Sequence, residues 1–251
     1  MQQGGHAIDF VRMHDGCSFQ EAVAKLLGGE QGQTFRSASE RNAEPQKLFA
    51  LPLPHHNMRR VYAYLMKQRH IDRDIITHFA RAGTLYEDAK YHNAVFVGTD
   101  EHGVSRHAQK RSTNSQGKSF KLNVAGSDAR YSFHHLGDDG DLYVFEAPID
   151  LLSYITLHPE NWQQHSYVAC CGTSYEPVRW ILTRMEAPQM VSLCLDHDNA
   201  GDQGCERMAK QISSEFGFPT RRLVPEQKDW NEDLCALREA PRRQRMEMEM
   251  R

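Results

Sequence analysis

Two carboxylates one residue apart form the strongest chemical signal in the sequence. Asp196 and Asp198 follow residues 191–195 (VSLCL), an apolar run with the length and composition of a buried parallel strand. In open α/β sheets, ligands bind in the crevice outside the carboxyl ends of the strands, so both acids are expected there. Neighbouring carboxylates repel each other unless a cation lies between them. Because oxygen ligands suit hard cations, the pair predicts a Mg²⁺ or Mn²⁺ site.

A bare Asp-x-Asp is more often a solvated loop, but a matching acid upstream favours the metal site. Glu146 ends a second strand-like run at residues 142–145, and Pro148 suits the first turn of a helix predicted over 148–158. Asp150 lies in that first turn. Two strand–acid–turn–helix units in one chain predict parallel strands of a single sheet with right-handed crossovers. The acids would then converge on one edge of the sheet.

The elements that must position these acids alternate along the C-terminal half. Further strands are predicted at 166–171 and 220–224, and further helices at 177–185 and 205–216. This alternation predicts an α/β fold, with a small parallel sheet flanked by helices.

The preceding segment has a mixed α+β pattern. Its helices are predicted over 57–66 and 71–82, and its β-like runs at 93–98, 104–108 and 119–124, with Asp100 and Gly103 turning the first hairpin. Basic residues gather here, and they form either a solvated sheet face or a strip that binds phosphates. This basic group consists of Arg106, Lys110, Arg111, Lys118, Lys121 and Arg130.

Composition adds weaker constraints. The chain of 251 residues allows one large domain or two modest ones, and its net charge of −3 does not by itself indicate a nucleic-acid partner. No apolar stretch approaches the roughly 18–20 residues of a membrane span, and no secretory signal is recognisable. The six cysteines form no C-x-x-C pair, so reduced thiols in a cytoplasmic protein are expected. Their spacing assembles no zinc site.

The half from Leu142 to Leu234 resembles a Toprim domain, the catalytic module shared by bacterial primases, topoisomerases and some nucleases. That family has a glutamate after its first strand and an Asp-x-Asp after its third, where this chain has Glu146, Asp196 and Asp198. The run DHDNAG at 196–201 is similar to the primase form of the motif, and GTS at 172–174 resembles the small-residue turn after the second strand. The run KDWNED at 228–233 resembles a signature of primase-like Toprim proteins from plasmids, phages and other mobile elements.

The N-terminal segment looks like the tail of a primase zinc-binding domain. The runs GGHAIDFV at 4–11 and GCSFQEA at 16–22 carry this resemblance, and Ser18 with Glu21 fits a capping box for a helix over 20–27. The zinc ligands are absent from this chain. The resemblance implies five segments: a zinc-domain tail at 1–28, a linker at 29–46, an α+β primase-like subdomain at 47–138, a Toprim catalytic domain at 139–238 and a flexible tail at 239–251.

The resemblance implies a nucleotidyltransferase that synthesises primers on single-stranded DNA from nucleoside triphosphates. Asp196 and Asp198 are expected to bind Mg²⁺ or Mn²⁺, with Asp150 as a further ligand, while Glu146 either shares a metal or takes the hydroxyl proton. Two such ions, roughly 3.5–4 Å apart, hold the attacking and leaving oxygens in line. A replicative helicase is a further expected partner, and neither a membrane contact nor a zinc site is expected.

Other residues are candidates for binding nucleotide or DNA. Lys228 either contacts a nucleotide phosphate or forms a loop salt bridge, with Asp229 and Asn231 orienting the site. Asp202 is a surface acid or a secondary site residue. The basic residues Arg106, Lys110 and Arg111 are candidates for template or triphosphate binding.

Two alternatives to a primase stay open. A Toprim nuclease would use the same acids with water as the attacking group. A non-catalytic Toprim protein would bind DNA or a partner within a replication or transfer complex of a mobile element. The zinc-domain tail favours the primase over the nuclease. The missing zinc ligands leave a non-catalytic protein possible as an alternative, whereas the intact acids argue against a non-catalytic protein. The chain is too short for the strand-passage domains of a topoisomerase.

Overall fold

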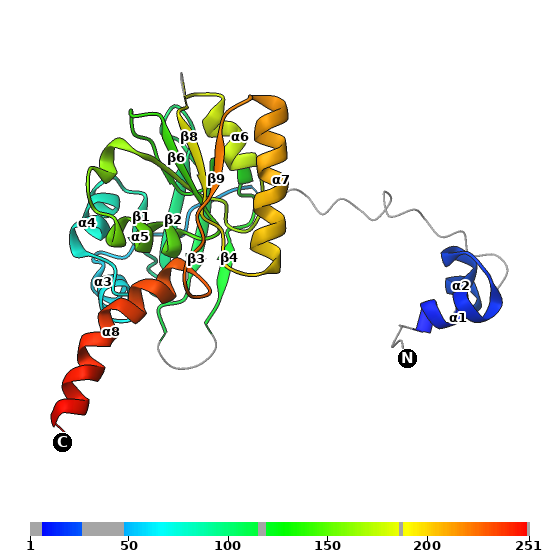
Figure 1. Ribbon diagram of the computed structural model, residues 1–251, viewed down its shortest axis with the longest axis horizontal. Helices are drawn as coiled ribbons and strands as arrows, with labels where there is room; N and C mark the ends of the chain where they lie inside the picture. Colours follow the sequence, from blue (N-terminus) through cyan, green and yellow to red (C-terminus); the bar gives the residue numbers. More distant parts are fainter. Residues whose placement is uncertain (1–6, 27–47, 115–118, 186–187, 250–251) are drawn as a thin grey trace. The chain divides into compact units, whose positions relative to one another are not determined.

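The computed structural model describes residues 7–26, 48–114, 119–185 and 188–249, which Figure 1 draws in colour. The chain divides into two units, Met1–Gln46 and Lys47–Arg251. The predicted linker at 29–46 lies outside the described residues, as does the glycine pair at positions 4 and 5.

The first unit is a helix pair, α1 (Ala7–Asp15) and α2 (Phe19–Leu26). The backbone N–H of Ser18 donates to Glu21 Oε2 at 2.8 Å, and the N–H of Glu21 donates to Ser18 Oγ at 3.4 Å. These reciprocal bonds form the predicted capping box, and they satisfy N–H groups that have no partner within the helix.

The second unit begins with two helices and an antiparallel sheet. Its elements are α3 (Arg59–Lys67), α4 (Arg73–Arg81), β1 (Leu85–Glu87), β2 (Ala94–Thr99), β3 (Ser105–Arg111) and β4 (Lys121–Asn123). The strand order is β1-β2-β3-β4, so β4 is an edge strand. The predicted turn between β2 and β3 is confirmed, because the Asp100 carboxylate accepts from the N–H groups of His102 and Val104, and Gly103 has a φ of 73°.

A second, largely parallel sheet follows. Its strands are β5 (His134–His135), β6 (Asp141–Phe145), β7 (Ser166–Ala169), β8 (Met190–Leu193) and β9 (Thr220–Arg222), in the order β5-β7-β6-β8-β9. The helices are α5 (Pro148–Leu157), α6 (Glu176–Leu182), α7 (Asn199–Glu215) and α8 (Trp230–Glu249), with short 3₁₀ turns η2 (Ala129–Tyr131) and η3 (Trp162–Gln164). Strands β6 to β9 pair in parallel, which confirms the predicted α/β fold, whereas the short antiparallel β5 was not predicted.

Side chains of the central strand alternate between two cores. Tyr143 and Phe145 pack with α5, α8 and the helices of the antiparallel half, and Leu142 and Val144 pack with α6 and α7. Figure 1 shows these helix pairs on opposite sides of the parallel sheet. In a strand that is apolar on both faces, each fully buried large side chain contributes about 1.5–3 kcal/mol to the free energy of folding. This burial holds the carboxyl ends of β6 and β8 in place.

One helix begins before its predicted start, and a second, α8, was not predicted. Helix α7 begins at Asn199 rather than at 205, because Asp198 caps it and draws the glycine-containing run into the helix. Helix α8 continues to Glu249, past the position where the sequence predicts a tail. Residues 239–249 are rich in Arg, Glu and Met, which favour helix.

Within the described ranges, the helices lack the combination of length and apolar character that a bilayer crossing requires.

Candidate active site

Glu146 and Asp196 follow neighbouring parallel strands. Strands β6 and β8 pair in the register Val144↔Leu193, and the N–H of Cys194 donates to the Val144 carbonyl at 2.8 Å. Glu146 comes directly after β6, and Asp196 lies shortly after β8. The pairing therefore brings both acids to the same carboxyl edge of the sheet.

Asp198 is tied to the start of α7. Its Oδ1 accepts from the N–H of Ala200 at 3.0 Å and from the N–H of Gly201 at 2.9 Å. One carboxylate oxygen thus caps the helix, where a negative charge is also favoured by the helix dipole. The other oxygen has no hydrogen bond within the described part of the chain and is available to a ligand.

The backbone of Asp196 is clamped from two sides. A Cβ atom on Gly201 would lie 2.0 Å from the Asp196 carbonyl oxygen, so α7 approaches this backbone as closely as only glycine permits. On the other side, the Arg222 guanidinium donates to the carbonyls of Leu195 at 2.7 Å and Asp196 at 2.8 Å. Arg222 also pairs with the exposed Asp202 at 3.2 Å, which makes Asp202 a surface acid. The positioning role of Arg222 has no signal in the sequence.

The acids influence one another electrostatically. The pKa of Asp196 is raised to about 6, chiefly by burial and in addition by the carboxylates of Glu146, Asp229 and Asp198, whereas the ammonium of Lys121 opposes the rise. Repulsion of this kind shows that these acids share one environment.

Asp150 belongs to the same group from the first turn of α5. It is 6% exposed. Burial raises the pKa of Asp150 well above its usual range, and the carboxylates of Asp229 and Asp196 add to that rise. The group of Glu146, Asp150, Asp196, Asp198 and Asp229, called here the acidic group, therefore comes from three separate segments of the chain.

The acidic group fits a hard divalent cation. Oδ1 of Asp196 is buried, and the described residues offer it no hydrogen-bond partner. Leaving a buried carboxylate oxygen unpaired is costly, and a cation would meet that demand. The carboxylate oxygens of Glu146, Asp196 and Asp198 do not all lie within 4.8 Å of one another, so the group is wider than a compact three-ligand site.

Lys121 reaches the acidic group from the antiparallel sheet. Its Nζ lies 3.7 Å from Glu146 Oε1, and its side chain is 53% exposed while that of Glu146 is 16% exposed. Lys121 therefore sits at the rim of the acidic group and does not fill it. The sequence predicts a basic residue here but not this contact, because the contact joins two sheets.

The three basic candidates on β3 do not form one strip. Arg111 pairs across the sheet with Lys121, so these two side chains lie on the face of the acidic group. Lys110 lies on the opposite face, because strand side chains alternate. Arg106 lies where the register between β2 and β3 shifts, and its Nε donates to Asp100 Oδ2 at 2.7 Å. Of Lys110 and Arg111, only Arg111 shares a face with Lys121, and the binding role of all three residues stays a prediction.

Asn231 is buried, and its amide is bonded to other residues of the protein. It is 3% exposed. Its Nδ2 donates to the Arg69 carbonyl and to Ser153 Oγ, both at 2.9 Å, and its Oδ1 accepts from Arg69 Nη1 at 3.0 Å. These bonds use both N–H groups of its amide, so they support the predicted role of Asn231 in orienting the site, and its contact with nucleotide or DNA stays a prediction.

The rest of the 228–233 run also links the loop to the acids. The carbonyl of Lys228 accepts from the N–H of His197 at 2.7 Å, which ties this loop to the residue between the two aspartates. Trp230 Nε1 donates to the Cys194 carbonyl at 2.9 Å. Asp229 joins the acidic group while its Oδ1 accepts from the N–H of Glu232 at 2.8 Å. The Lys228 side chain is exposed.

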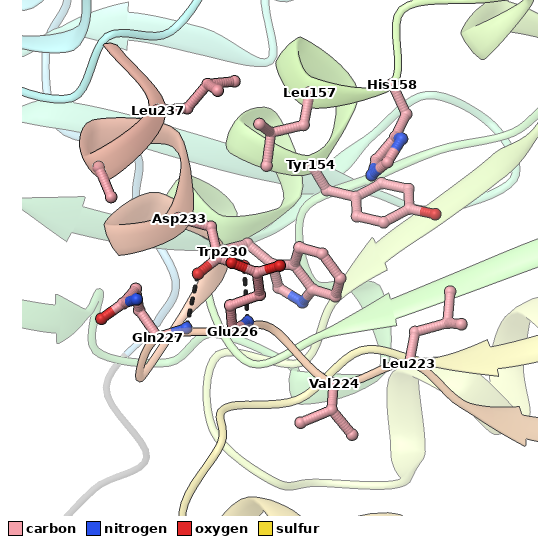
Figure 2. A pocket seen from close by; sticks show the side chains of 11 residues that line it. Tyr154, Leu157, His158, Leu223, Val224, Glu226, Gln227, Trp230, Asp233 and Leu237 are labelled. Carbon is pink, nitrogen blue, oxygen red and sulfur yellow. Dashed lines mark hydrogen bonds between the residues drawn. The ribbon is translucent and has the colours of Figure 1, made fainter. Parts of the chain in front are cut away.

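A cavity of about 660 Å³ lies beside α5, α8 and the segment after β9. Figure 2 shows Tyr154, Trp230 and Leu223 among its lining side chains, with Asp233 bonded to the backbone of Glu226 and Gln227. None of the acidic group lines this cavity, so it is separate from the candidate active site.

Comparisons with known proteins agree with this geometry. Residues 143–234 match the Toprim-like family, and residues 63–139 match the family described as a protein of unknown function, DUF3991. An uncharacterized protein of Bacillus anthracis is 28% identical over 250 residues, covering 91% of this chain and 72% of that protein.

Solved primase structures share the fold. The primase fragment of the bacteriophage T7 primase-helicase protein is similar with a TM-score of 0.53 and 19% identity, covering 68% of each chain. The Escherichia coli primase catalytic core is similar with a TM-score of 0.50 and 15% identity, covering 72% of this chain and 69% of that one. Residues 143–234 are therefore a Toprim-like domain, in a chain whose fold resembles that of primase catalytic cores.

Proposed function

We propose that this protein is a metal-dependent nucleotidyltransferase that synthesises primers on single-stranded DNA. The observation that carries the proposal is the acidic group, which holds the buried, unpaired Asp196 Oδ1 and is met at its rim by Lys121. A cluster of carboxylates suited to divalent cations, next to cationic side chains, matches the demands of phosphoryl transfer.

Each residue has a proposed task. Asp196 and Asp198 would hold Mg²⁺ or Mn²⁺, with Asp150 and Asp229 as neighbouring carboxylates. Bound there, the ions would polarise the reacting phosphate and lower the pKa of the attacking hydroxyl. Glu146, which lies beside Lys121 at the rim of the acidic group, would share a cation or accept the proton of the ribose 3′-hydroxyl.

The cationic side chains would bind phosphates. Lys121 and Arg111 lie on one face of the antiparallel sheet beside Glu146, and Lys228 is exposed on the loop bonded to His197. These residues would contact the triphosphate of the incoming nucleotide.

The template would follow the edge strand β4. All of its residues are exposed, and Phe120, just before it, exposes 42% of its surface. An exposed aromatic ring beside basic residues suits stacking of an unpaired base. In a similar solved structure, T7 primase domains are bound to an RNA/DNA hybrid and dTTP, and we propose the same classes of ligand here. A replicative helicase is proposed as the further partner.

A synthesis assay tests the proposal. The protein is incubated with mixed single-stranded templates, labelled ribo- or deoxynucleoside triphosphates and Mg²⁺ or Mn²⁺, and the products are separated on denaturing gels. Template-dependent oligomers are expected. Cleavage of the template without synthesis would instead indicate the nuclease, and binding of DNA without either reaction would indicate the non-catalytic protein.

Matched variants tie the activity to the site. Asp196→Asn removes one charge from the acidic group at nearly constant size and should abolish synthesis. Asp138→Asn makes the same chemical change at an exposed residue before β6, on the opposite edge of the sheet, and should leave synthesis unchanged. Turnover that persists in Asp196→Asn would refute the assignment of the acids.

A further inference from the structure

A second constellation of ligand-type side chains lies in the antiparallel half. One ligand atom each from His55, Glu87 and His92 lie within 4.8 Å of one another. Nδ1 of His92 is 2.6 Å from Glu87 Oε1, and Nδ1 of His55 is 3.8 Å from the same oxygen. The three residues come from the segment before α3, the end of β1 and the loop before β2.

Glu87 is held in a position to bind a cation. Its side chain is 2% exposed. Oε2 accepts from the backbone N–H groups of Arg60 at 3.0 Å and Val61 at 3.2 Å, at the start of α3. Those two bonds fix the carboxylate and direct Oε1 toward the two imidazoles. In the described part of the chain its ion pairs are with histidines only, so no lysine or arginine neutralises this buried carboxylate.

The loop that carries His92 is equally well fixed. Buried Asp88 accepts from the backbone N–H groups of Lys90, Tyr91 and Asn93 and from Asn93 Nδ2. His92 itself has a φ of 58°, a left-handed conformation that is uncommon for a residue with a Cβ atom. Strained backbone of this kind persists where the surroundings hold it, and here it turns the imidazole toward Glu87.

We propose that His55, Glu87 and His92 form a structural site for a transition-metal cation of the Zn²⁺ class. Two imidazole nitrogens and one carboxylate oxygen are a donor set that zinc takes, with the fourth position left to solvent. Ligand atoms bound tetrahedrally to one zinc ion at about 2.0–2.2 Å lie about 3.3–3.6 Å apart. The separations of 2.6 and 3.8 Å bracket this range, and His55 Nδ1 would exchange its contact with the Asn57 carbonyl, 3.1 Å away, for the cation. The bonds from Arg60 and Val61 would orient the ligating carboxylate from behind.

The proposed metal site would stabilise the antiparallel sheet that carries Lys121. Glu87, Ala94, Arg111 and Lys121 are successive partners across β1, β2, β3 and β4, so they form one row on one face. With strands about 4.8 Å apart, the row spans about 14 Å from the proposed site to the rim of the acidic group. The site would fix one end of this row to α3, whose Tyr64 hydroxyl accepts from Arg111 at 3.3 Å.

A cysteine count does not reveal such a site, which is why the sequence predicts no zinc site.

The test must distinguish this site from a second group of ligand-type side chains. Asp139, Asp141 and His165 also bring three ligand atoms within 4.8 Å, but each of these residues is partly exposed and two of the three ligands are acids. His165→Ala is therefore the matched control for His55→Ala and His92→Ala.

The experiment measures zinc binding by the full chain in the Asp196→Asn background, so that the acidic group contributes less. Zinc content after gel filtration and the visible spectrum of the Co²⁺-substituted protein report stoichiometry and geometry. We expect zinc retained at one ion per chain and a tetrahedral Co²⁺ spectrum in the parent and in His165→Ala. We expect at least about tenfold weaker binding in His55→Ala and in His92→Ala.

Thermal unfolding supplies a second readout. Saturating Zn²⁺ should raise the melting temperature of the parent and of His165→Ala by about 5 °C or more, and should not raise that of the His55 or His92 variants. Using both variants guards against misfolding caused by the strained backbone at His92. Absence of zinc binding by the parent, or equal binding in parent and His55→Ala, overturns the proposal. Loss of binding in His165→Ala alone overturns it as well. None of these outcomes depends on primer synthesis.

Discussion

The ammonium of Lys121 lies 3.7 Å from the carboxylate of Glu146, so an edge strand of the antiparallel sheet contacts the acidic edge of the parallel sheet. The two residues are partners from different sheets and distant parts of the sequence. Because the Lys121 side chain is about half exposed, the pair can open to admit a phosphate without moving the backbone.

Replacing Lys121 with alanine should lower kcat/KM for nucleotide addition by about tenfold, because a charge-assisted bond to phosphate is worth roughly 1.5–3 kcal/mol. The control is Lys110→Ala, which removes the same charge from the opposite face of the neighbouring strand and should change kcat/KM less than twofold. Steady-state kinetics with varied nucleotide provides the measurement. Equal losses in both variants would mean that only the overall charge of the sheet matters, and higher activity in Lys121→Ala would mean that the lysine obstructs the site.

Replacing Asp196 with asparagine should stabilise the protein at alkaline pH while it abolishes synthesis. The pKa of Asp196 is raised from 3.8 to about 6 in the folded protein, so the folded state binds this proton more tightly than the unfolded state does. The favourable contribution of the protonated form is complete below about pH 4, and it is lost as the pH rises to about 6 and beyond. The asparagine variant carries no titrating group at this position, so its stability should not fall with pH for this reason.

Urea denaturation at pH 4, 6 and 8 in the presence of a chelator measures the difference between the two proteins. The variant should gain stability relative to the wild type between pH 4 and pH 8. Saturating Mg²⁺ should then stabilise the wild type but not the variant, because a ligand that binds only the folded state raises its stability. A stability difference that does not change with pH would contradict the raised pKa.

Replacing Gly201 with alanine should destabilise the protein by about 1–3 kcal/mol, although alanine is the better helix former. The added Cβ would lie 2.0 Å from the Asp196 carbonyl oxygen, which is backbone and cannot rotate away. At Gly204, on the same helix, an added Cβ would meet Leu195 Cδ1 at 2.9 Å, and that side chain can adjust. Urea denaturation should therefore show a smaller loss for Gly204→Ala, and equal losses would argue against a specific clamp on Asp196.

Replacing Asn231 with alanine should cost about 2–3 kcal/mol of stability, because it leaves Arg69 and Ser153 with unpaired polar groups in a buried place. Lys228→Ala, three residues earlier, changes an exposed side chain and should alter stability by less than about 0.5 kcal/mol while weakening nucleotide binding. Thermal unfolding and nucleotide titration on both variants separate the two roles. A stable Asn231→Ala protein with weakened nucleotide binding would instead assign Asn231 a direct contact with the nucleotide.

Local patterns in the sequence were sufficient for most of the fold. Apolar patterns in the sequence predicted helices α3, α4 and α5 and the parallel strands. Two residues three positions apart predicted the capping box of α2. Short elements escaped prediction, as β1 and β5 show, because three or two residues carry no measurable period. The start of α7 was misplaced because glycines that commonly form turns are there required for close packing against Asp196.

The sequence by itself determined which acids end the strands, since a strand, a carboxylate and a following helix are consecutive in the chain. Only the tertiary structure decided which other residues join them. Lys121, Arg222 and Asp229 reach the acids through sheet pairing and loop contacts between distant segments, and the burial that raises the pKa of Asp196 exists only once those segments pack together. The same reason separates Arg111 from Lys110 and buries Asn231: side-chain direction depends on pairing and packing partners far along the chain.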